Sequence, residues 1–276
     1  MAIDVNLSGF LTGHSASSRG FGDLDANPQQ CARQEIPYKC LRIPARREFW
    51  AVAQVPPPHV NQTMISLLND GQWMLFGVIL VALMISLSFH EFGHAVTALR
   101  FGDDTARRAG RLTVNPVAHI DPLGLLMVVF VGFGYAKPVP TNPRLFNSRY
   151  AELWVAAAGP LMNLLLAVIS VNAYLLVLKW GWISLADVGP RLFFIYLAQI
   201  NLLLMIFNLL PVGALDGHYI LPYFLPRRLA HAYRYYNARY GNFALLALVA
   251  LAILGVPIFS TIIGLSAGLL QWIAFV

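Results

Sequence analysis

Charged residues are scarce in this chain of 276 residues: Asp, Glu, Lys and Arg make up 12% of it, while 58% is hydrophobic. Soluble globular domains carry about 25% charged residues. Together with a mean hydropathy of +0.61, the scarcity excludes an ordinary soluble domain and predicts an integral membrane protein surrounded by the lipid bilayer. The formal net charge of +6 does not predict nucleic-acid binding, because the basic residues flank apolar segments, where lipid head groups and membrane orientation account for them.

Cysteine is nearly absent as well. Cys31 and Cys40 are too few for a disulfide framework or a zinc knuckle. The N-terminal residues lack the basic and apolar regions of a secretory signal peptide. The first membrane segment is therefore expected to act as its own insertion signal.

Composition divides the chain into three parts. Residues 1–70 show no helical or strand period and are expected to form an extended or partly disordered tail. Residues 71–222 form the core, and residues 223–276 hold the C-terminal membrane segment or segments. We expect an α-helical integral membrane protein with about 4–6 membrane segments.

A transmembrane helix needs about 20 apolar residues. Three runs satisfy this, at 73–99, 152–178 and 192–210. The last apolar stretch, 242–276, is interrupted by Gly255-Val256-Pro257. That stretch predicts one helix plus a bent or interfacial piece.

The segment 123–135 is apolar but too short to span a bilayer. It is rich in Val and Phe and contains glycines, so we expect it to form a short re-entrant β-hairpin, with Asp121 as the cap at its start. Exposed backbone at membrane depth persists only where protein or a water-filled cavity covers it. The hairpin is therefore expected beside the active cavity.

Basic residues mark the cytoplasmic side of membrane proteins. The loop between the first two spans is rich in them, whereas the next turn carries Lys179 and Arg191. The C-terminal end of the first span is therefore expected to face the cytoplasm, in the bacterial inner membrane.

The first span contains the pattern HExxH at His90, Glu91 and His94. On a helix His90 and His94 share one face, and Glu91 is rotated by about 100° from His90. Two imidazoles that bind Zn²⁺ and a carboxylate that reaches the attacking water are the arrangement of zincins. The pattern also occurs by chance, but ionisable groups within a span are costly unless they have partners and a function.

A zinc hydrolase needs a third protein ligand. Acidic residues near the spans are few, and Asp216 follows a run broken by Pro211 and Gly213 at the cytoplasmic end of the third span. Asp216 is therefore the candidate third ligand. The alternative is a helix cap at the membrane surface.

At this point the chain resembles the site-2 proteases, intramembrane zinc metalloproteases. HEFGHA at 90–95 is similar to their first motif and NLLPVGALDG at 208–217 to their second. Segments 115–124, 132–140 and 156–163 resemble the compact branch without a PDZ or CBS domain. The resemblance covers about residues 75–221. One departure is that Gly213-Ala214 stand where the family often has a second proline.

The resemblance implies a set of site residues. The Zn²⁺ ligands would be His90, His94 and Asp216, with Glu91 as general base. Asn208 and Pro211 would shape the ligand loop, with Asn208 contacting substrate backbone. Gly132, Phe133 and Gly134 would form a re-entrant β-loop that pairs with an unwound substrate, as an exposed edge strand can do.

Two further polar residues have open roles. His119 is either a hydrogen-bond donor or oxyanion stabiliser near the metal, or a satisfied interfacial histidine. Asn163 lies within a span and must find a partner across the helices or in the cavity.

The function expected is therefore an intramembrane zinc endopeptidase. Its substrates would be single-span membrane proteins or remnant signal peptides, and a regulatory partner would be a further way to select them. The alternatives are a non-proteolytic membrane protein with a structural metal and a different membrane zincin whose third ligand is a glutamate. The presence of Glu91 argues against a structural site, which needs no base.

Overall fold

The computed structural model describes residues 64–131, 134 and 136–276. These residues form helices and turns and include no strand. Both cysteines, together with Gly132 and Phe133, lie outside the described part of the chain. The expected α-helical architecture is confirmed for the residues that the structure describes.

Three helices of the described chain are long and apolar enough to span a membrane. They are α5 (Trp73–Arg100), α9 (Ala151–Lys179) and α10 (Val188–Asn208). Their bounds agree with the predicted spans to within four residues. Apolar composition sets these helices because in hydrocarbon every backbone N–H must find its partner within the segment.

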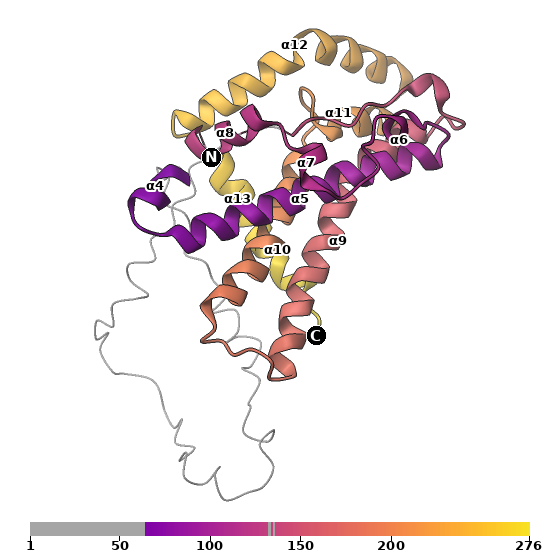
Figure 1. The fold of residues 1–276 in the computed structure, drawn as a ribbon. Helices are drawn as coiled ribbons and strands as arrows, with labels where there is room; N and C mark the ends of the chain where they lie inside the picture. The colour runs from indigo at the N-terminus through magenta and orange to yellow at the C-terminus, as the bar shows by residue number, and fades with distance from the viewer. Residues whose placement is uncertain (1–63, 132–133, 135) are drawn as a thin grey trace, which may run out of the picture.

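These three helices pack against one another to form the centre of the molecule (Figure 1). One buried cluster joins α9 to α10 around Tyr174 and Leu202, and a second joins α5 to α10 around Ile79. Gly93 lets α5 pack closely on α9, since a Cβ there would lie 2.8 Å from the carbonyl oxygen of Ala158. Small residues at such contacts are typical of helix packing in membranes.

Seven further helices and two 3₁₀ turns complete the described chain. They are α4 (Met64–Asn69), α6 (Thr105–Arg108), α7 (Pro116–His119), α8 (Pro122–Val131), η1 (Pro143–Leu145), α11 (Asp216–Ile220), η2 (Leu221–Phe224), α12 (Arg227–Ile253) and α13 (Ile258–Ile273). Helix α4 occupies the end of the segment expected to be extended, and it buries Met64 and Leu67. Helix α12 lies across the top of the molecule in Figure 1.

The prediction of a re-entrant hairpin at 123–135 is wrong over most of that segment. Pro122–Val131 forms the helix α8, and Asp121 caps it, its carboxylate accepting from the N–H groups of Leu123 and Gly124 at 2.9 and 3.0 Å. A side-chain cap followed at once by proline starts a helix efficiently. Of the glycine-containing end of the predicted hairpin, only Gly134 lies in the described chain, where it packs against α8.

The C-terminal part, for which one helix plus a bent or interfacial piece was expected, forms two helices. Helix α12 starts at Arg227, well before the apolar run, and ends before Gly255, which has a φ of +97°. The break expected at 255–257 is confirmed, because α13 follows at Ile258. With 16 residues α13 is shorter than a typical span. The described chain therefore contains three candidate spans, fewer than the 4–6 membrane segments expected.

Candidate metal centre

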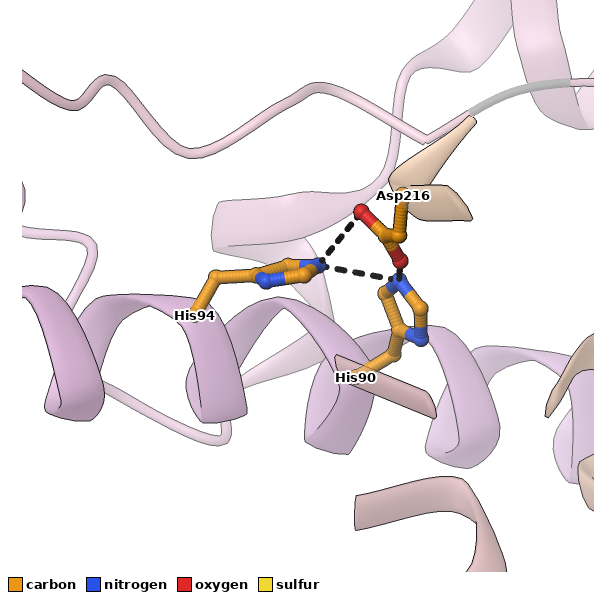
Figure 2. A group of neighbouring side chains, drawn as sticks. All are labelled: His90, His94 and Asp216. Carbon is orange, nitrogen blue, oxygen red and sulfur yellow. Dashed lines mark hydrogen bonds and ion pairs between the residues drawn. The ribbon is translucent and has the colours of Figure 1, made fainter. Parts of the chain in front are cut away.

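His90 and His94 lie one turn apart on α5 and point to the same side of the helix (Figure 2). Their Nε2 atoms are 3.1 Å apart. His90 is buried and His94 is partly buried. The i, i+4 spacing thus brings two imidazole nitrogens to one point, as the sequence predicted.

Asp216 reaches this point from the first residue of α11 (Figure 2). Its Oδ2 atom lies 3.2 Å from Nε2 of His90, and its Oδ1 atom lies 3.4 Å from Nε2 of His94. Taking one possible ligand atom from each of the three residues, all three atoms lie within 4.8 Å of one another. The ligand motif near the end of the third span and the HExxH motif of the first are therefore brought together.

The spacing of these atoms fits a zinc ion. Tetrahedral Zn²⁺ with bonds of about 2.0–2.1 Å holds its ligand atoms about 3.3 Å apart. The two Nε2 atoms are 3.1 Å apart, and each lies 3.2 or 3.4 Å from a different oxygen of the Asp216 carboxylate. Two imidazoles and one carboxylate are also a known ligand set of catalytic zinc sites, which leave the fourth position open for water or substrate.

The backbone of α9 orients His94. Its Nδ1 atom lies 2.7 Å from the carbonyl oxygen of Val155. A carbonyl can only accept, so Nδ1 carries a proton, and Nε2 is the ring nitrogen that faces His90 and Asp216. The tautomer that a metal requires is therefore set by the fold.

Gly159 of α9 makes room for the two rings. A Cβ at this position would lie 2.6 Å from Cε1 of His90 and would also collide with Nε2 of His94. A residue with any side chain would have to displace a ligand. The closeness of α9 to the imidazoles thus depends on this glycine.

Glu91 is buried beside the three donors, with 8% of its surface exposed. Its Oε2 atom accepts a hydrogen bond from the N–H of Val139 at 3.1 Å. The segment that carries Val139 is held in turn by Asp103, whose carboxylate accepts from the N–H of Asn142 at 2.6 Å. The carboxylate of Glu91 is therefore oriented by backbone and is not one of the three clustered donors.

The charge of Asp216 suits a ligand. Burial opposes its ionisation, but the adjacent His94 and His90 outweigh the burial, so the pKa of this carboxyl lies well below its ordinary value. A charged carboxylate beside imidazoles is the form that binds zinc.

Comparison with known proteins agrees with this geometry. The family model described as peptidase family M50 matches residues 78–184 and 176–254. The chain belongs to peptidase family M50. These are the site-2 proteases, so the resemblance seen in the sequence is confirmed and the chain is a zinc metalloprotease.

The relatives support the family assignment. YwhC of Bacillus subtilis, named as an inferred zinc metalloprotease, is 42% identical over 155 residues, which cover 55% of this chain and 71% of YwhC. Rip2 of Mycobacterium tuberculosis, named in the same way, is 30% identical over 52% of this chain. Rip2 of Mycolicibacterium smegmatis is 33% identical. The matched part spans 56% of each Rip2 protein. No solved structure matches the chain.

The remaining motif residues of this M50 peptidase lie outside the donor cluster. Asn208 ends α10 and donates from Nδ2 to the carbonyl of Leu204 at 3.0 Å. Pro211 is exposed. Asn163 is fully buried in α9, and no hydrogen-bond partner is found for its side chain among the described residues.

His119 is fully buried and hydrogen-bonded. Its surface exposure is 0%, and Nε2 lies 2.7 Å from the carbonyl oxygen of Thr113. The backbone carbonyl of His119 accepts from Lys137, close to the segment that orients Glu91. The contacts support a role in holding that segment rather than one on the metal.

An apolar cavity of about 120 Å³ runs along α5 on the N-terminal side of the metal centre of the M50 peptidase. It is lined from five helices, α4, α5, α8, α10 and α13, by residues that include Leu83, Leu87, Val128, Phe207 and Ile262. Leu87 is three residues before His90 and four before Glu91, so the cavity wall continues onto the face that carries these residues.

Sequence reasoning missed the contribution of α12. Asn237 and Tyr233 bind the loop that leads to Asp216. An isolated asparagine in a helix has no spacing signal that could have revealed this contact. Gly159, by contrast, lies in a segment that already resembled the family.

Proposed function

We propose that this M50 peptidase is an intramembrane endopeptidase that cleaves peptide bonds in transmembrane segments or remnant signal peptides. The observation that carries the proposal is the cluster of His90 and His94, in the C-terminal half of the apolar helix α5, with Asp216 of α11, beside the buried Glu91. Ionisable groups at such a position are costly unless they are used.

His90, His94 and Asp216 would hold Zn²⁺. When bound, the ion lowers the pKa of a water molecule and polarises a carbonyl group. The proton on Nδ1 of His94 is kept there by Val155, which leaves Nε2 free for the metal. The protein therefore holds the three donor groups close together before the ion arrives.

Glu91 is the proposed general base. It would accept a proton from the attacking water and deliver it to the nitrogen of the leaving amine, so that the proton count balances. The hydrogen bond from Val139 to Oε2 holds the carboxylate in one orientation during both transfers. Burial removes competing solvent from this carboxylate, which strengthens its interaction with the water.

The apolar cavity supports a membrane substrate. Its lining of Leu, Ile, Val, Met and Phe side chains would receive an apolar side chain of a substrate segment, for which burial against such a wall is favourable. We propose single-span membrane proteins as substrates. Selection among them would rest on this core or on a regulatory partner.

Orientation follows from the basic loop between α5 and α9. Arg107, Arg108, Arg144 and Arg149 lie in this loop, at the end of α5 that carries the metal centre. By the positive-inside tendency, we propose that the active site faces the cytoplasmic side of a bacterial inner membrane.

The test compares the wild type with Glu91→Gln on a tagged single-span substrate reconstituted with the enzyme in liposomes. Glu91→Gln keeps the size and the acceptor for Val139 but cannot take a proton. Cleavage should be lost while bound zinc is retained. Equal cleavage by both proteins would refute Glu91 as the base, and a wild type without cleavage of any single-span substrate would favour a non-proteolytic role.

A further inference from the structure

The loop that leads to Asp216 is held from outside the family's motifs, by helix α12. This ligand loop comprises residues 209–215. Oδ1 of Asn237 accepts a hydrogen bond from the N–H of Gly213 at 3.0 Å, and Nδ2 of Asn237 donates to the carbonyl oxygen of Gly213 at 3.0 Å. One side-chain amide thus satisfies both polar groups of a single loop residue.

A second side chain of α12 binds the same loop. The hydroxyl of Tyr233 donates to the carbonyl oxygen of Pro211 at 2.8 Å. Tyr233 and Asn237 are four residues apart and so lie on one face of α12. Three hydrogen bonds from this face fix the backbone of the ligand loop at two points.

The loop backbone fits α12 closely only because position 213 is glycine. Gly213 is buried and has a φ of +64°. A Cβ there would lie 2.9 Å from Cβ of Leu245 and 3.1 Å from the carbonyl oxygen of Gly241. Proline could not stand here, because its φ is fixed near −65° and it has no N–H to donate to Asn237. The contact with α12 therefore requires the glycine that stands at 213, where the family often has proline.

The position of Asp216 depends on this loop. Asp216 follows Gly213 by three residues, and Leu215, between them, is buried. The turn is closed by a hydrogen bond from the N–H of Leu215 to the carbonyl of Val212 at 3.4 Å. Gly217 packs directly on the carbonyl oxygens of Leu209 and Leu210. A short, closed turn of this kind transmits a displacement at Gly213 to the carboxylate.

We propose that Asn237 is a positioning residue for the metal centre, acting through Gly213 to place the carboxylate of Asp216, with Tyr233 as its auxiliary. The inference rests on the proposed metalloprotease function. Changes in groups that orient metal ligands typically lower metal affinity by about 10–100-fold. We expect Asn237→Ala to weaken zinc binding by about 10-fold or more and Tyr233→Phe by a smaller factor.

The experiment measures zinc affinity in the full-length protein in detergent micelles. The protein is stripped with a chelator, and zinc is returned in competition with a chromophoric chelator. The melting temperature of the zinc-free form is recorded in parallel. Asn242→Ala, an exposed asparagine on the same helix, is the matched control for Asn237→Ala, and exposed Tyr236→Phe is the control for Tyr233→Phe.

Weaker zinc binding by Asn237→Ala at an unchanged melting temperature of the zinc-free form supports a positioning role. Affinity equal to that of Asn242→Ala overturns it. If Asn237→Ala does not fold, the comparison of Tyr233→Phe with Tyr236→Phe decides in the same way. A wild type that binds no zinc would instead refute the metalloprotease function, so the two failures are distinguishable.

Discussion

The carbonyl oxygen of Val155 on α9 lies 2.7 Å from Nδ1 of His94 on α5. This contact joins the two helices at the candidate metal centre and places a proton on Nδ1 of a proposed metal ligand. The same stretch of α9 also contributes Gly159, which leaves space for both imidazole rings. Helix α9 thus shapes the site without contributing any of its three clustered donors.

Gly159→Ala should therefore damage the metal centre while leaving the fold in place. The added Cβ would collide with both imidazoles, so we expect zinc affinity to fall by about 10-fold or more, together with peptidase activity. Chelator competition and circular dichroism measure the two effects. Gly264→Ala in α13 is the control, because a Cβ there meets nothing within 4 Å, and its zinc affinity should equal that of the wild type. Equal affinities for the two variants would contradict this role of Gly159.

Removal of a ligand gives a stronger effect. His90→Ala, His94→Ala and Asp216→Ala should each lower the zinc content of the purified protein from about one ion per chain toward zero, because two remaining ligands bind weakly. Elemental analysis measures the stoichiometry. Full occupancy in any of these variants would show that the ligand set is wrong.

Asp103 provides a pH-dependent contribution to stability near the active site. Burial opposes its ionisation, but hydrogen bonds from Thr105 and Asn142 outweigh the burial and hold the pKa of this carboxyl below its ordinary value. Because the folded-state pKa is lower than the unfolded value of about 3.9, the stabilisation is fully present above that pH. It is lost as the pH falls through the folded-state pKa.

We therefore expect Asp103→Asn to reduce the free energy of unfolding by about 1–3 kcal/mol at neutral pH, with a difference from the wild type that shrinks as the pH falls below about 4. Thermal melting of both proteins between neutral and acidic pH measures this difference. A difference that stays constant over the whole range would contradict the assignment. Cleavage should also fall, since Asp103 holds the segment that orients Glu91.

A buried polar contact joins α5 to α10. Nδ2 of Asn201 donates to Oγ of Ser86 at 2.8 Å, and both residues are fully buried. Hydrogen bonds between membrane helices contribute about 0.6 kcal/mol on average and up to about 1.7 kcal/mol. A double-mutant cycle of Ser86→Ala with Asn201→Ala should give a coupling energy in this range.

Ser88→Ala is the control for that cycle. Ser88 donates to Met84 within its own helix, so its coupling with Asn201→Ala should be close to zero. Unfolding in mixed micelles supplies the energies. Similar coupling energies for both serines would show that the hydrogen bond between the helices makes no net contribution to stability.

Much of the central fold could be predicted because hydrocarbon imposes simple rules. Long apolar runs must be helical, which placed α5, α9 and α10. The spacing of His90 and His94 needs only helical geometry, and the scarcity of acidic residues near the spans left Asp216 as the candidate third ligand. The core of the site was therefore accessible from the residues themselves.

The rest depends on local capping and on tertiary contacts. The Val and Phe residues of 123–131 favour extended chain, but the cap from Asp121 and the following Pro122 start a helix. The sequence predicted only the apolar C-terminal part of α12, although its arginine-rich first half is helical too. The contact of Asn237 with Gly213 spans 24 positions in the sequence and has no local pattern.

The most direct test of a zinc-dependent cleavage by Glu91 measures metal content and cleavage in one preparation. Wild type, Glu91→Gln and His94→Ala are reconstituted with a tagged single-span substrate, and zinc stoichiometry and cleavage are measured on the same samples. We expect zinc with cleavage for the wild type, zinc without cleavage for Glu91→Gln, and neither for His94→Ala. Cleavage by Glu91→Gln at the rate of the wild type, or by a zinc-free His94→Ala, would contradict this expectation.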